Sequence, residues 1–162
     1  MSLMGVGTNI LGYCHNEVDN AVKKVIKKGN LTTLNCPEEV FLAEKLISMH
    51  PWAGKVKFAR TGGEANAIAI RIARAASGKE KVAFCGYHGW HDWYLAANLK
   101  KNNLKEFLLP GLSPSGVPKN LKNTIYTFKY NDFKKLKYLV ERKIKVLQMI
   151  LESCNSMIRS SE

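Results

Sequence analysis

One stretch, residues 55–92, carries most of the information about the fold: KVKFARTGGEANAIAIRIARAASGKEKVAFCGYHGWHD. Its first six residues predict a short strand through Val56 and Phe58. A helix rich in small apolar residues follows directly, and we expect it to end at Gly78. Residues 81–85 predict the next strand. Strands that alternate with helices are typical of crossover units in a parallel sheet.

The sequence on both sides of this stretch continues the alternation. Apolar spacing and turn residues predict helices over residues 16–28, 37–50, 92–98 and 132–142, and strands over residues 124–128 and 146–151. Asn16 is expected to cap the first helix and Gly29 to follow its end. Residues 109–118 hold three prolines and two glycines and predict irregular structure. We therefore expect an α/β fold, with a mostly parallel sheet flanked by helices.

Length and composition limit the class of protein. The chain has 162 residues, 46% of them hydrophobic, which predicts one domain with a core and excludes a disordered chain. No apolar run reaches about 18 residues, so we predict no membrane span. The N-terminus lacks the pattern of an export signal, so we expect a cytoplasmic protein. Its four cysteines are then expected to be reduced: Cys14, Cys36, Cys85 and Cys154.

Positive charge is concentrated in the second half of the chain. The formal net charge is +12, and residues 100–145 carry 12 basic against 3 acidic side chains. A nucleic-acid footprint is one interpretation of this pattern. We favour a solvated, lysine-rich surface, because arginine is scarce there and no base-reading module is visible. Nucleic-acid binding is therefore kept only as an alternative.

The four residues Thr61-Gly62-Gly63-Glu64 stand between a predicted strand and a predicted helix. Thr61 and Glu64 have the spacing of a capping box. The glycines let the backbone approach a ligand, and N–H groups at a helix start favour an anion such as a phosphate. The loop matches neither the Walker A pattern nor the dinucleotide pattern. A tight turn that caps a helix and binds nothing is an equally open interpretation.

A second loop, residues 86–92, follows the next predicted strand and is expected at the same sheet edge. Tyr87 can stack on a flat ligand, and His88 can hydrogen-bond it or relay a proton. Trp90, Trp93 and Tyr94 are predicted to be packing residues.

Other kinds of site have less support in the sequence. Metal-ligating residue types crowd together at Cys85, His88, His91 and Asp92, but they need not converge and no second cluster exists, so we predict no metal site. Nucleophilic catalysis is not indicated, because no Gly-x-Ser-x-Gly elbow occurs and no cysteine has an assignable base. Cys36 is expected at a helix start, and the other cysteines are expected to be buried apolar groups.

Residues 58–67 and 86–92 together resemble the class III aminotransferases, which are pyridoxal-phosphate enzymes of fold type I. The likeness is greatest to the glutamate-1-semialdehyde aminomutase group. Residues 5–13 and 34–39 resemble that group as well, and the likeness extends to Glu152. The resemblance implies that this chain is part of the large domain of a fold-type-I aminotransferase.

The resemblance also implies a pyridoxal-phosphate site made of Thr61, Gly62, Gly63, Tyr87, His88 and Glu152. The backbone of the first three would hold the cofactor phosphate, close to the helix opening at Glu64 and Asn66. Tyr87 would stack on the pyridine ring with His88 and Gly89 beside it, and Glu152 would lie near the cofactor. The substrate would be a small amino or keto compound, and the enzyme a homodimer.

The sequence departs from the family pattern in ways that affect activity. Family members are more than twice as long, and their Schiff-base lysine and pyridine-pairing aspartate lie on later strands without a counterpart here. No catalytic residue is therefore assigned, and we expect a truncated form that does not turn over. Residues 1–3 are expected to be a vector leader, 4–152 a fragment of the cofactor-binding domain, and 153–162 a divergent tail. A non-catalytic, self-associating binding module is the alternative.

Overall fold

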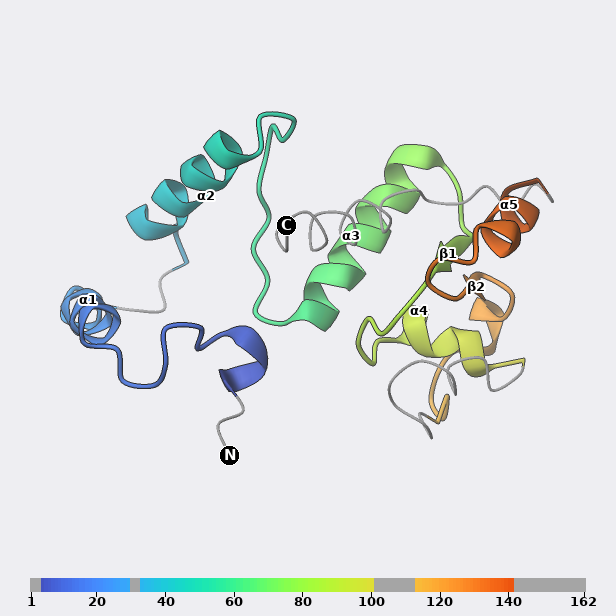
Figure 1. Ribbon diagram of the computed structural model, residues 1–162, viewed down its shortest axis with the longest axis horizontal. Coiled ribbons are helices and arrows are strands. Elements are labelled where there is room, and N and C mark those ends of the chain that lie inside the picture. The colour runs from blue at the N-terminus through green and yellow to red at the C-terminus, as the bar shows by residue number, and fades with distance from the viewer. Residues whose placement is uncertain (1–3, 30–32, 101–112, 142–162) are drawn as a thin grey trace. The chain divides into compact units, whose positions relative to one another are not determined.

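The computed structural model describes residues 4–29, 33–100 and 113–141 (Figure 1). The chain divides into two compact units, Met1–Lys57 and Phe58–Glu162, and each is described by itself. The strand predicted at 146–151, Glu152, Cys154 and the tail at 153–162 lie outside the described residues. Within the described ranges, no helix has the length and apolar character needed to cross a membrane.

The first unit consists of short helices. Its elements are a 3-10 helix η1 (Met4–Gly7) and two α-helices, α1 (Asn16–Ile26) and α2 (Pro37–Met49). The predicted cap of α1 is wrong: His15 holds the N-cap position with an extended backbone, and no side chain caps the helix. Asn16 already has helical backbone geometry, so it is the first residue of the helix. Gly29 follows the end of α1 with a φ of 99°, as expected.

Helix α2 begins and ends where the sequence predicts. Pro37 is at its first turn after Cys36 as N-cap, and His50 is its C-cap. Neither α1 nor α2 has a buried residue. Apolar side chains of α1 are about half exposed, with Val18 at 47%, Val22 at 50% and Ile26 at 57%. The described residues of this unit therefore form no core of their own.

The second unit is built on a parallel pair of strands. Strand β1 (Val82–Phe84) pairs with β2 (Ile125–Thr127), and Val82 lies opposite Ile125. The pairing extends at both ends, because the Val82 N–H donates to Thr124 O at 2.8 Å and the Phe128 N–H donates to Phe84 O at 3.1 Å. The parallel orientation confirms the prediction from alternating strands and helices.

Helices cover both faces of this sheet. They are α3 (Gly62–Ser77), α4 (Asp92–Leu95), η2 (Ala96–Asn98), η3 (Lys119–Leu121) and α5 (Phe133–Glu141). Val82 and Phe84 pack with α3 and α4, whereas Ala83 and Cys85 pack with Leu139 of α5. Figure 1 shows β1 and β2 between α4 and α5. A strand covered on both faces is apolar throughout, which explains the continuous run Val-Ala-Phe-Cys.

The strand predicted at residues 55–60 is not formed. This stretch has no strand assignment, and the described sheet contains only β1 and β2. A strand requires a hydrogen-bonded neighbour, which the alternation of Val56 and Phe58 does not supply. Phe58 is accordingly 37% exposed. The helix after this stretch does end at Gly78, whose φ is 64°.

Candidate functional site

Helix α3 begins with the capping box that the sequence predicts. Thr61 Oγ1 accepts a hydrogen bond from the backbone N–H of Glu64 at 3.2 Å. The Glu64 carboxylate turns back and accepts from the N–H groups of Thr61 at 3.2 Å and Arg60 at 3.0 Å. Side chains thus pair three backbone donors at or just before the helix start, those of Arg60, Thr61 and Glu64.

The capping box leaves the two glycine N–H groups at the helix start without a partner in the part of the chain that the structure describes. The next N–H along the helix, that of Ala65, donates to Thr61 O at 3.0 Å. Among the described residues, none accepts a hydrogen bond from the N–H of Gly62 or Gly63. Thr61 and Gly62 are exposed, and a side chain at position 62 would meet open space. This start of α3 therefore offers two adjacent donors at the positive end of a 16-residue helix.

The loop before α4 packs against this helix start (Figure 1). A β-carbon built on Gly89, which is buried and has a φ of 107°, would lie 3.0 Å from Gly63 Cα. Asn66 of α3 adds a hydrogen bond from its Nδ2 to His88 O at 3.4 Å. The two loops therefore meet as predicted, but not as the ends of two neighbouring strands. Only the loop at 86–92 follows a strand, β1, because the strand predicted at 55–60 is not formed.

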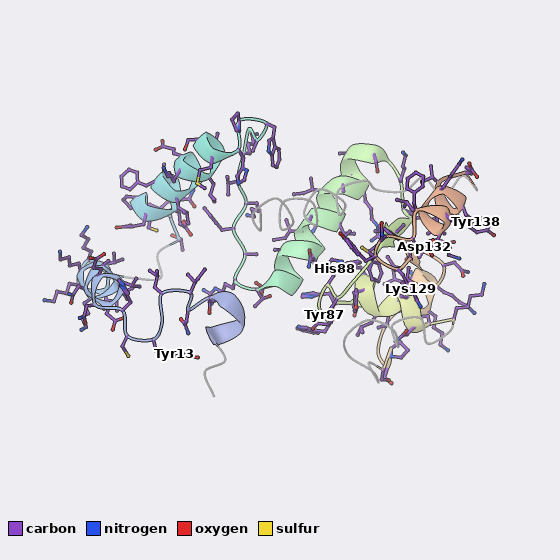
Figure 2. The ribbon with its side chains drawn as sticks, viewed as in Figure 1. Tyr13, Tyr87, His88, Lys129, Asp132 and Tyr138 are labelled. Carbon is purple, nitrogen blue, oxygen red and sulfur yellow. The ribbon has the colours of Figure 1, made fainter. Side chains whose placement is uncertain are left out.

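Tyr87 presents an aromatic ring at this edge of the second unit (Figure 2). Its side chain is 41% exposed, and its ring meets the buried Tyr94 edge-to-face, with centroids 5.8 Å apart. Tyr94 OH donates to Gly86 O at 3.4 Å, and burial raises the pKa of Tyr94. The fixed Tyr94 thus supports one side of Tyr87 while part of the Tyr87 ring stays accessible.

His88 turns into the core rather than outward. Its Nε2 donates to Cys85 O at 2.6 Å, and its ring meets Phe84 edge-to-face at 5.5 Å. Burial lowers the pKa of His88, and the hydrogen bond to Cys85 O opposes this shift. The imidazole therefore joins the loop to the end of β1, and its Nε2 is already used within the protein.

The remaining candidates have mixed outcomes. Trp93 and Tyr94 are buried in the core as predicted. Trp90 is 67% exposed, and its ring stacks on His91. Cys85 is buried as expected, but Cys14 is exposed with a φ of 57°. Within the described ranges, no group of three His, Cys, Asp or Glu side chains can hold a metal ion.

Two residues that the sequence did not single out for these roles connect the loops. They are Asn66, which donates to His88 O, and His91, whose ring lies against Gly63. Neither belongs to a general motif, so only their closeness in sequence to Gly63 and Gly89 could have indicated them. Glu152, the last predicted site residue, lies outside the described residues.

A parallel sheet with helices on both faces and a glycine-started helix beside an aromatic loop is part of the fold-type-I architecture. The chain belongs to the class-III aminotransferase family, whose sequence profile matches residues 2–159. It is 36% identical over 140 residues to a 3-aminobutyryl-CoA aminotransferase of Cloacimonas acidaminovorans, covering 86% of this chain. It is 38% identical over 132 residues to a glutamate-1-semialdehyde 2,1-aminomutase of Sulfurisphaera tokodaii, covering 80% of this chain.

The chain spans only 30% of the length of each of these two relatives. A solved transaminase structure with PLP bound matches 80% of this chain and 30% of its own, with a TM-score of 0.65 and 26% identity. The family and this structure indicate pyridoxal phosphate as the cofactor. The described residues fit such a group, because unpaired N–H donors suit its phosphate and an accessible aromatic ring suits its flat pyridine.

Proposed function

We propose that this chain contributes the cofactor cradle of a pyridoxal-phosphate-dependent aminotransferase or aminomutase. One observation carries the proposal: the two unpaired N–H groups of Gly62 and Gly63 open beside the loop that holds Tyr87. The comparisons with relatives support it, because the family profile matches residues 2–159 of the chain. Residues 4–152 are then a segment of the cofactor-binding domain.

Each residue of the cradle has a physical task in this proposal. The glycine N–H groups donate to the cofactor phosphate, and the Thr61 hydroxyl, which uses its oxygen in the capping box, still has a proton to donate. Tyr87 stacks on the pyridine ring, and His88 anchors its loop to β1. Pyridoxal phosphate, when bound, supplies the electron sink for chemistry at the amino-bearing carbon. Glu152 is the remaining contact that we propose near the cofactor.

The substrate class follows from the relatives. Matching proteins are named for 3-aminobutyryl-CoA and for glutamate-1-semialdehyde. We therefore propose a small amino or keto compound as substrate, with amino-group transfer as the reaction. A homodimer is proposed for the functional form, because the apolar faces of α1 are left uncovered within the first unit.

These 162 residues by themselves are proposed to bind the cofactor without turning over. No lysine among them is assigned the Schiff-base role, and covalent attachment of the cofactor requires such an amine. An absorbance titration of the purified chain with pyridoxal phosphate tests binding, and pyridoxal without its phosphate is the matched ligand. We expect saturable binding that depends on the phosphate; equal, non-saturating signals for both ligands would refute the proposal. Transaminase activity with a borohydride-trapped lysine adduct would refute the lack of turnover.

A self-associating module without cofactor is the second candidate. It is favoured by the exposure of large apolar residues in the first unit, among them Phe41 at 65% and Trp52 at 82%. A chain that self-associates but gives no phosphate-dependent titration would support this candidate over the first.

A further inference from the structure

Position 63 is confined by the opposite loop. A β-carbon built on Gly63 would lie 2.9 Å from Nδ1 and 3.0 Å from Cε1 of His91, and 3.9 Å from Gly89 Cα. The first distance is shorter than real β-carbon contacts, so a side chain at position 63 would displace the His91 ring. The adjacent Gly62 has no such neighbour within 4 Å. The His91 ring therefore occupies the space next to Gly63, the second residue of α3.

The orientation of His91 is not explained by its own helix. His91 is the N-cap of α4, a position whose side chain usually accepts a hydrogen bond from the helix, yet it makes no cap hydrogen bond. Its Nδ1 is buried, and no described residue forms a hydrogen bond with it. The ring instead stacks on Trp90, with centroids 4.8 Å apart and planes at 26°. Packing against Trp90 and Gly63 thus holds the ring.

We infer that His91 is a positioning residue for the phosphate end of the proposed cofactor site. Its ring presses on Gly63 and fixes the backbone N–H groups at the start of α3 before an anion binds. A preorganised pair of N–H donors loses less conformational entropy on binding than a mobile pair. Such a pair therefore binds the phosphate with higher affinity. This inference rests on the proposed function, and it assigns His91 an action through Gly63 and not through the pyridine ring.

The experiment compares Gly63→Ala, His91→Ala and the double variant by absorbance titration with pyridoxal phosphate and with pyridoxal. The ratio of the two affinities isolates the contribution of the phosphate. We expect each single change to lower this ratio by about tenfold and to leave pyridoxal affinity unchanged. The double variant is expected to bind better than Gly63→Ala alone, because removal of the ring makes room for the new β-carbon. His91→Ser, which supplies a good N-cap to α4, replaces His91→Ala where that variant does not fold.

The outcomes separate this inference from the proposed function. If the unmodified chain shows no phosphate-dependent binding, the proposed function fails. If the unmodified chain binds but the His91 variants keep its affinity ratio, the positioning role is overturned while the cradle stands. The double variant gives a second test. If its fold-loss in the affinity ratio equals the product of the losses of Gly63→Ala and His91→Ala, the positioning role is also overturned. A purely structural role would lower the unfolding midpoint of the His91 variants without changing the ratio.

Discussion

Gly63 and Gly89 touch backbone to backbone: a β-carbon on Gly89 would lie only 3.0 Å from the Cα of Gly63. Gly63 is the second residue of α3, whereas Gly89 lies in the loop that precedes α4. This contact places the unpaired N–H groups of α3 next to the loop of Tyr87. Several measurable consequences follow from it and from its surroundings.

Replacing Gly89 by alanine is expected to destabilise the chain by about 2–3 kcal/mol, because overlap with Gly63 adds to the strain of a φ of 107°. Gly86→Ala is the matched control in the same loop. Its φ is 85°, but its β-carbon would meet only His88 Nε2 at 4.0 Å, so about 1 kcal/mol is expected. Urea unfolding measures both. Equal losses would contradict the close approach at Gly63.

Removing the capping hydroxyl with Thr61→Ala is expected to lower the free energy of unfolding by about 1 kcal/mol, because the Glu64 N–H loses its acceptor. Thr61→Ser keeps the hydroxyl and should cost less than half as much. Thermal or urea unfolding of the three chains gives the comparison. A Thr61→Ser chain as unstable as Thr61→Ala would show that the methyl group, not the cap, matters.

Truncating Tyr87 to alanine is expected to weaken pyridoxal-phosphate binding by about three- to tenfold, since an aromatic stacking contact contributes about 0.5–1.5 kcal/mol. Tyr87→Phe retains the ring and is expected to bind like the unmodified chain. Tyr130→Ala, which removes a tyrosine that is 66% exposed on another segment, is the control for loss of an exposed ring. Absorbance titration measures all three. A loss in Tyr130→Ala as large as that in Tyr87→Ala would argue against a specific stack.

The half-buried His88 predicts that stability falls in mild acid. Its pKa is lowered on folding, chiefly by burial, so the unfolded chain binds the proton more readily. The free energy of unfolding should therefore decrease as pH falls below the usual histidine pKa of about 6.5, and this contribution should level off below the folded pKa. His88→Asn is expected to flatten that decline. Urea midpoints between pH 7.5 and 5, about the range in which histidine titrates, measure it; parallel curves for the two chains would contradict it.

The half-exposed apolar face of α1 predicts self-association of the chain. Serine at positions Val18, Val22 and Ile26 together should lower the molar mass measured by light scattering at a given concentration. Val140→Ser on α5, where the side chain is 53% exposed, is the control for removing exposed apolar surface elsewhere. An unmodified chain that stays monomeric at high concentration would contradict the prediction.

The sequence predicted most elements because their signals are local. The capping box of Thr61 and Glu64, the proline that begins α2 and the positive φ of Gly78 each depend on neighbours within one or two helical turns. The strand prediction for residues 55–60 is wrong for the opposite reason. Alternation shows a preference for extended backbone, but a strand also needs a hydrogen-bonded partner. The predicted N-cap of α1, Asn16, is one residue after the observed N-cap, His15, which is the usual margin of error at a helix end.

The sequence alone determined the positions of β1 and β2, the glycine-started helix and the family motifs, because periodicity, caps and motifs are properties of consecutive residues. Only the tertiary structure decided that His88 turns inward to Cys85 and that His91 rests on Gly63. Those orientations depend on which side chains fill the space between α3, β1 and α4, and close packing of distant segments leaves no periodic trace in the chain.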